Sequence, residues 1–140
     1  MKFLSAKLGA ALIIGMVIFG FAEAWGEDWK LYSETDFFSS YFDKENISRI
    51  SKNIVRVWVK EVNTEKGMTD MVNRFGEEFK NCDHIKKLYE VDCAEKGIRI
   101  LSSAAYSRAG EVIISDDSPS KWISIMPKSE GEALHKTVCK

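Results

Sequence analysis

Three side chains suited to binding a partner stand at alternate positions of one apolar run. Arg56, Trp58 and Lys60 are separated by Val57 and Val59. In an extended strand alternate side chains point to the same face, so the three predict a row of cation, aromatic ring and cation. Such a row can bind a protein or a glycan through ion pairs and cation–π contacts. Arg56, Trp58 and Lys60 are therefore the candidate partner-binding residues.

The same row also has a structural interpretation, which we favour from the sequence. In it Trp58 packs beneath a C-terminal helix, and the stems of Arg56 and Lys60 cover the ring while their charged ends stay in water. Antiparallel sheets with one solvated face often carry rows of this kind. The two interpretations differ in whether Trp58 lies under a helix or on an open face.

The three cysteines, Cys82, Cys93 and Cys139, allow one disulfide in an oxidising compartment. We prefer Cys93 with Cys139, because Cys93 ends a strand-like run and Cys139 lies beside the C-terminus, which frays unless it is tied down. Cys82 is then a buried apolar side chain, a free thiol or a link to a second copy. Pairing of Cys82 with Cys93 is the alternative.

Metal binding and catalysis find little support in the sequence. His84 and His135 lack the paired short spacings of zinc sites, and Asp116 and Asp117 fit a turn better than a calcium loop. The chain has no Gly-x-Ser-x-Gly, no phosphate-binding glycine loop and no His-Glu-x-x-His. We expect no metal site, no cofactor and no enzymatic activity.

The first 24 residues have the pattern of a cleaved signal peptide. Two lysines precede an apolar run over residues 8–21, and residues 22–24 have the small-x-small form of a cleavage site. The run is shorter than the ~20 residues of a membrane-spanning helix, and no lipid-attachment cysteine follows it. We expect removal of residues 1–24, and an exported single domain over residues 25–140 without a permanent membrane anchor.

The charge of this expected domain is close to neutral. Taking Lys2, Lys7 and Glu23 from the 20 basic and 21 acidic residues of the chain leaves a net charge of −2. Nucleic-acid binding calls for a basic surplus on one face, and no cluster in this sequence departs far from mixed signs. We expect no nucleic-acid partner.

The elements that position these residues are mostly strands. Alternating, β-branched and aromatic runs predict strands over residues 29–32, 37–42, 47–50, 54–62, 85–93, 98–106, 111–115 and 122–125. Short turn sequences between neighbouring runs predict antiparallel hairpins. The valines of the run 54–62 are expected to face the core, opposite the candidate row, and Lys87 falls on the apolar side of its run.

Two helices complete the expected fold. Apolar side chains at three- and four-residue steps predict an amphipathic helix over residues 68–79, on an edge or face of the sheet. Ser129 followed by Glu132 matches a capping box and predicts a short C-terminal helix, with Leu134 and Val138 on one side. The fold class is therefore α+β, a multi-stranded antiparallel sheet with two helices.

Several segments together resemble the surface-adhesin protein E family of bacteria. They are Val55–Lys60, Tyr89–Cys93, Arg99–Ser102, Trp122, and the Pro127-x-Ser129-x-x-Glu132 start of a helix that ends at Val138-Cys139. The resemblance covers nearly all of residues 25–140. It implies an antiparallel sheet whose concave face holds the C-terminal helix by a disulfide, in agreement with the preferred pairing of Cys93 and Cys139.

The resemblance also implies a function. An adhesin of this family binds host extracellular-matrix and serum proteins, is reported to bind haem and can form dimers. This chain differs by lacking the lipid-attachment cysteine and by carrying the amphipathic segment 68–79. We expect an exported binding module with a protein partner, in the periplasm or on the outer cell surface. The alternatives are a periplasmic protein for small-ligand binding or envelope maintenance, and a small structural homodimer.

Overall fold

The computed structural model describes residues 27–140, so the expected signal peptide over residues 1–24 lies outside the described residues. The described strands are β1 (Trp29–Glu34), β2 (Phe38–Asp43), β3 (Ser48–Arg49), β4 (Ile54–Asn63), β5 (Cys82–Asp92), β6 (Gly97–Ser107), β7 (Val112–Asp116) and β8 (Ile123–Ser124). The helices are α2 (Glu65–Phe75), α3 (Glu130–Val138) and the 3-10 turns η1 (Lys44–Asn46) and η2 (Glu77–Phe79). No helix within this part of the chain is long and apolar enough to cross a membrane.

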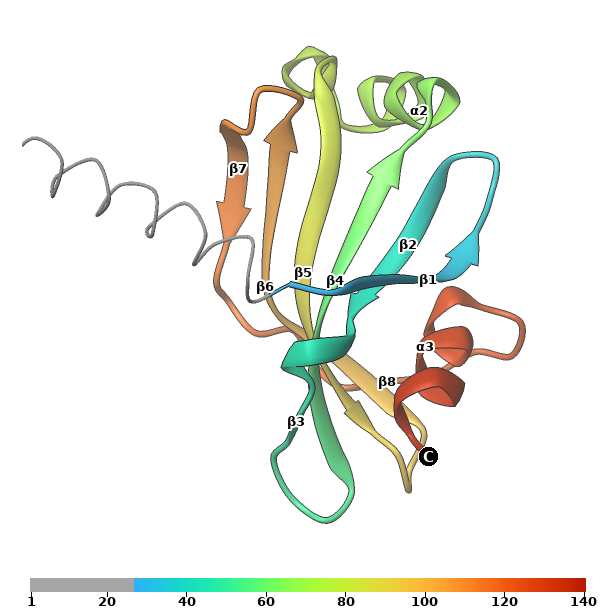
Figure 1. The fold of residues 1–140 in the computed structure, drawn as a ribbon. Coiled ribbons are helices and arrows are strands. Elements are labelled where there is room, and N and C mark those ends of the chain that lie inside the picture. The colour runs from blue at the N-terminus through green and yellow to red at the C-terminus, as the bar shows by residue number, and fades with distance from the viewer. Residues whose placement is uncertain (1–26) are drawn as a thin grey trace, which may run out of the picture.

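These strands form one antiparallel sheet in the order β1-β2-β4-β5-β6-β7, with β3 paired to β4 and β8 paired to β6 (Figure 1). Each neighbouring pair along this order except β2 and β4 is also consecutive among these strands. Short turns join β1 to β2, β5 to β6 and β6 to β7, whereas α2 and η2 lie between β4 and β5. The predicted α+β fold class is confirmed. So are the predicted strands, although β5 begins at Cys82, three residues before the expected start.

The segment after β7 departs from the expected hairpin pattern. Its strand β8 pairs with the beginning of β6, where Ile123 lies opposite Ile98, and does not pair with β7. The reason is that β7 covers only the second half of β6 and leaves backbone groups of the first half free. Ser120 satisfies two of them, since its N–H donates to the Ile100 carbonyl at 2.8 Å and its hydroxyl accepts from the Ile100 N–H at 2.9 Å.

The two faces of the sheet differ in what covers them. The inner face, defined by Val55, Val57 and Val59 of β4, packs against Leu134 and Val138 of α3. All five are buried, which is worth about 1.5–3 kcal/mol for each large aliphatic side chain. The outer face is the opposite one, and it carries the alternate residues of β4.

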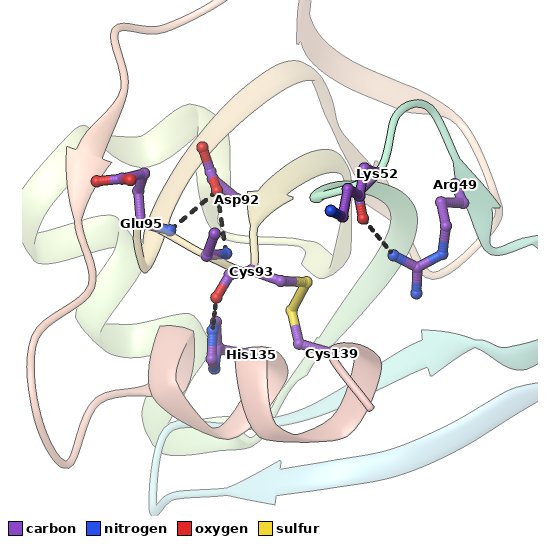
Figure 2. Close-up of a disulfide and its surroundings, with 8 residues drawn as sticks. Arg49, Lys52, Asp92, Cys93, Glu95, His135 and Cys139 are labelled. Atoms are coloured by element: carbon purple, nitrogen blue, oxygen red, sulfur yellow. Dashed lines mark hydrogen bonds between the residues drawn. A yellow bond between two sulfur atoms is a disulfide. The ribbon is translucent and has the colours of Figure 1, made fainter.

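A disulfide and several hydrogen bonds hold α3 on the inner face. Figure 2 shows the bond between Cys93, after β5, and Cys139, at the end of α3, with their Cα atoms 5.5 Å apart. His135 adds a second link, because its Nε2 lies 3.1 Å from the Cys93 carbonyl oxygen, to which it donates. At the start of α3, the Ser129 hydroxyl accepts from the Glu132 N–H at 3.2 Å. The predicted disulfide and capped helix are confirmed.

The third cysteine is a core residue. Cys82 has no exposed surface and packs with Phe79 and Ala105. Burial raises the pKa of its thiol, which keeps it protonated and unreactive. Cys93 is bonded to Cys139, so the alternative pairing of Cys82 with Cys93 is wrong. The buried position of Cys82 also gives a second chain no access to its sulfur.

The amphipathic helix lies on the same face of the sheet as α3, and it begins and ends earlier than expected. Thr64 caps it, because its hydroxyl accepts from the Gly67 N–H at 3.0 Å. Gly76 ends it with a φ of 111°, a conformation that favours glycine, so the predicted helix over 68–79 is divided into α2 and η2. Met71 of α2 packs over Ile85 and the rest of a small second core.

Candidate functional site

The candidate residues Arg56, Trp58 and Lys60 all lie on the outer face of β4, away from α2 and α3. Trp58 is 37% exposed. The structural interpretation that we favoured from the sequence is therefore wrong in its geometry. The apolar side of α3 is occupied by the valines of the inner face, so no part of the helix reaches Trp58.

A groove of about 630 Å³ crosses the outer face beside Trp58. Its walls come from β1, β2, η1, β3, β4, β5 and β6 and from the residues just before β1. The lining residues are Glu27, Trp29, Asp43, Asn46, Ser48, Arg56, Trp58, Lys86, Leu88 and Tyr106. Arg56 and Trp58 are thus brought together in one site, whereas Lys60 is not part of the wall.

Lys60 lies beside the groove. Its ammonium is 5.0 Å from the centroid of the Trp29 ring, and that ring is one of the groove walls. A second cation repeats this arrangement on the next strand, where Lys86 lies 5.5 Å from the centroid of Tyr106. The antiparallel register explains the repetition, because it places Lys60 directly opposite Lys86 and Trp58 directly opposite Leu88. Cation–π contacts of this kind contribute about 0.5–1 kcal/mol each at exposed positions.

The position of Arg56 is fixed by a buried carboxylate. Glu90, whose side chain is only 4% exposed, accepts from Arg56 at 2.7 Å and from Arg99 at 2.8 Å. Burial pushes the pKa of Glu90 upward, but the hydrogen bonds from the two arginines outweigh burial and hold this pKa below its usual range. The guanidinium of Arg99 in turn lies 4.9 Å from the centroid of the Trp122 ring.

These contacts determine what the groove can bind. Arg56 already has a carboxylate partner, and so does Lys86, which lies 3.5 Å from Glu27. Within residues 27–140, Lys60 has no carboxylate within 4 Å. The site therefore offers one uncommitted ammonium beside exposed aromatic surface. This combination suits a polypeptide segment that presents a carboxylate next to an apolar side chain.

The residues considered for metal binding have other roles. His84 stacks on Tyr106 with ring centroids 5.0 Å apart and lies 2.9 Å from Asp83, while His135 bonds to the backbone. Asp116 accepts from the Ser118 N–H at 2.8 Å, as a turn residue does. Among residues 27–140, no group of three or more His, Cys, Asp or Glu side chains is arranged to hold a metal ion.

The inner face carries a charged cluster that the sequence analysis did not identify as a site. Lys87 and Glu61 form an ion pair at 3.1 Å, with side chains only 22% and 7% exposed. Tyr32 of β1 donates to Glu130 of α3 at 2.8 Å beside them. The available signals were Lys87 on the apolar side of its strand and Glu61 in step with the valines of β4.

The family model described as surface-adhesin protein E matches residues 29–140. A structure of Haemophilus influenzae protein E, in its crystal form II, is similar with a TM-score of 0.51 at 10% sequence identity, and the match covers 77% of this chain and 91% of that chain. A second structure of that protein has a TM-score of 0.49 at 12% identity, over 81% of this chain and 91% of the other. No curated protein matches the sequence.

Proposed function

Because this chain belongs to the surface-adhesin protein E family, we propose that it is an exported, non-enzymatic binding module that engages a protein partner at the cell envelope or surface. Two features support the proposal. The family match extends over almost the whole described part of the chain. The outer face also has a groove with exposed aromatic and cationic side chains, and this groove is the observation that carries the proposal.

The groove has the residue types that carry most of the energy in protein interfaces. Trp and Arg are enriched among such residues, and here Trp58 and Arg56 lie side by side in one wall. The ion pair of Arg56 with Glu90 holds its guanidinium in place before a partner arrives, which lowers the entropic cost of binding. Lys60 supplies the uncommitted positive charge. We infer that the partner presents an acidic segment with an apolar side chain beside the carboxylate.

The proposed location is the outer cell surface or the periplasm. The signal-peptide pattern of residues 1–24 supports export, and the family supports the surface. Treatment of intact cells with a protease distinguishes the two compartments by immunoblot. Degradation of this protein while a periplasmic control survives is expected for a surface module. Protection together with the control would place it in the periplasm.

Binding by whole cells tests the adhesin role itself. Cells with and without the gene are compared for adherence to immobilised extracellular-matrix and serum proteins, and the gene restored on a plasmid serves as control. We expect at least one of these proteins to hold cells only when the gene is present. Equal adherence of both strains to every protein, with the module shown to be at the surface, would contradict an adhesin function.

A second candidate function is small-ligand binding between a helix and the sheet. One observation favours it, namely a cavity of about 390 Å³ between α2 and the inner face. This volume is within the usual range of ligand sites, about 300–1,000 Å³. The cavity and the outer groove lie on opposite faces of the sheet, so the two functions are separable by substitution.

A further inference from the structure

The cavity on the inner face combines an apolar wall with a charged one. It lies between α2 and strands β4 and β5, close to the first residue of α3. Its lining includes Phe38, Met71 and Phe75 together with Glu61, Lys87 and Glu130. A site of this kind can bind a molecule that has both a charged group and an apolar body.

The charges in this cavity do not balance. Lys87 bonds to Glu61 at 3.1 Å, whereas Glu130 receives the hydroxyl of Tyr32 at 2.8 Å and faces the carboxyl group of Glu61. Asp70 and Arg74, also in the lining, neutralise each other at 3.1 Å. With Glu61 and Glu130 ionised there is one carboxylate more than there are cations, so the cavity lacks a positive charge.

The pKa values of Lys87 and Glu61 are both raised, as this excess of negative charge requires. Burial alone lowers the pKa of a lysine, yet Tyr89 and Glu61 raise the pKa of Lys87 above its ordinary value. Burial raises the pKa of Glu61, Lys87 opposes this increase and the nearby Glu130 adds to it, and the resulting pKa is about 7. The groups of the cluster hold protons firmly, as expected where a cation is missing.

A buried hydroxyl beside the carboxylates is also without a partner. Ser40 of β2 lies directly opposite Glu61 in the strand register and has no exposed surface. Its Oγ has no hydrogen-bond partner within the described residues. Buried polar atoms are nearly always paired, so this hydroxyl opposite Glu61 is an unsatisfied polar group near the cavity, although Ser40 is not part of the lining.

We propose that the inner-face cavity binds a small organic cation, a protonated primary amine with a short apolar body. The ammonium lies between the carboxylates of Glu61 and Glu130, and the body rests against Phe75 and Met71. Aromatic rings attract cations, which adds to the affinity. An anion is repelled by the two carboxylates, and a neutral apolar molecule leaves their excess negative charge uncompensated. This inference rests on the second candidate function and is independent of the outer groove.

Binding of the amine is coupled to the release of a proton from Glu61. The ionisable groups around Glu61 are Lys87 and Tyr89 of β5, Tyr32 of β1, Glu130 of α3, and Asp70 with Arg74 of α2. Near pH 6 Glu61 is mostly protonated, so it loses its proton when the ammonium arrives. Above pH 7 the carboxylate is already ionised. Affinity for an amine therefore increases from pH 6 to pH 8, with proton release that is largest at the lower pH.

The test uses three probes of nearly equal size with different charge, namely phenethylamine, 2-phenylethanol and phenylacetate. Each is titrated into the purified protein and followed by NMR and by calorimetry in two buffers of different ionisation enthalpy. We expect the amine to bind at least tenfold more tightly than the alcohol or the acid. Glu61→Gln and Glu130→Gln should each weaken amine binding about tenfold, whereas Trp58→Ala on the outer face should leave it unchanged.

The outcomes separate the cation proposal from the ligand-binding function beneath it. Equal binding of amine and alcohol would keep small-ligand binding but overturn the cation proposal. Absence of binding by all three probes at millimolar concentration would overturn both. If Glu61→Gln fails to fold, Glu130→Gln and Phe75→Ala carry the test, because the Phe75 side chain is 59% exposed and its loss is tolerated by the core. Unchanged amine affinity in both would also overturn the proposal.

Discussion

The ammonium of Lys87 and the carboxylate of Glu61 lie 3.1 Å apart on the same face of the sheet as the valine core. A buried ion pair rarely adds net stability, because removing both charges from water costs about as much as their attraction returns. Its presence divides the inner face into two regions, a dry core under α3 and a charged cavity under α2. The outer face differs from both of these regions, because its charged groups and aromatic rings are open to solvent.

The protonation of Glu61 should make the folded state less stable as pH rises. Its pKa is about 7 in the folded protein, above the ordinary value of 4.5, so the unfolded chain holds fewer protons between these values. The resulting contribution is fully present below pH 4.5, falls by up to about 1.4 kcal/mol per pH unit and is lost by pH 7. Urea unfolding at pH 4.5 to 8 measures it. The difference between wild type and Glu61→Gln isolates this group, and parallel curves for the two proteins would contradict the assignment.

The disulfide should be a major source of stability. It closes a chain segment with a sequence separation of 46, which on the chain-entropy model stabilises the fold by about 4 kcal/mol. Replacement of both Cys93 and Cys139 by Ser should lower the free energy of unfolding by this amount and free α3 for proteolysis. Dithiothreitol should destabilise the wild type and leave the double variant unchanged. A loss below about 1 kcal/mol would mean that packing of Leu134 and Val138 alone holds the helix.

Two helical glycines should respond to alanine in opposite directions. A Cβ built at Gly67 meets the Phe37 carbonyl oxygen, so Gly67→Ala must displace α2 or the β1–β2 turn. We expect a loss of about 1–3 kcal/mol. Gly131 in α3 has ordinary contacts, and Gly131→Ala should stabilise by about 0.5–1 kcal/mol through helix propensity. Thermal unfolding of the two variants measures both effects, and a Gly67→Ala variant as stable as wild type would refute the close approach of α2 to the turn.

Glu90 should be needed for the integrity of the outer face. Glu90→Gln removes the charge that pairs with Arg56 and Arg99, and we expect a loss of about 1–3 kcal/mol. The arginine side chains are 41% and 32% exposed, so solvent screens part of the effect. Glu95→Gln, at an exposed position, is the matched control and should change stability by less than about 0.5 kcal/mol. Equal stability of the two variants would show that the buried carboxylate is not required.

The strands were predictable because alternation is a local signal. The run around Val55, Val57 and Val59 identified the core face, and Ser129 with Glu132 identified the start of α3. The end of α2 was harder to predict, because Phe79 continues the apolar spacing beyond Gly76, where the backbone leaves the helix. Spacing alone does not report a backbone break of this kind.

The sites were only partly predictable because they depend on register. Alternation placed Arg56 and Trp58 on one face, but no local pattern shows that Trp29, Lys86 and Tyr106 meet them across the sheet. The prediction that Trp58 lies under α3 was wrong for the same reason. Tertiary packing decides which face of the sheet a helix covers, and no local pattern reports it. The inner-face cluster joins Tyr32, Glu61, Lys87 and Glu130 across four elements, and only the two middle residues carried any signal.

The affinity of the outer face for a partner is the property that follows most closely from the proposed function. Surface plasmon resonance compares wild type, Trp58→Ala and Phe75→Ala against the matrix or serum protein that holds the expressing cells. Both variants remove an exposed aromatic ring, one from the outer groove and one from α2 on the opposite side. We expect a loss of about 2 kcal/mol or more for Trp58→Ala, roughly thirtyfold in Kd, and no change for Phe75→Ala. Unchanged binding by a folded Trp58→Ala variant would show that the outer groove is not the partner-binding surface.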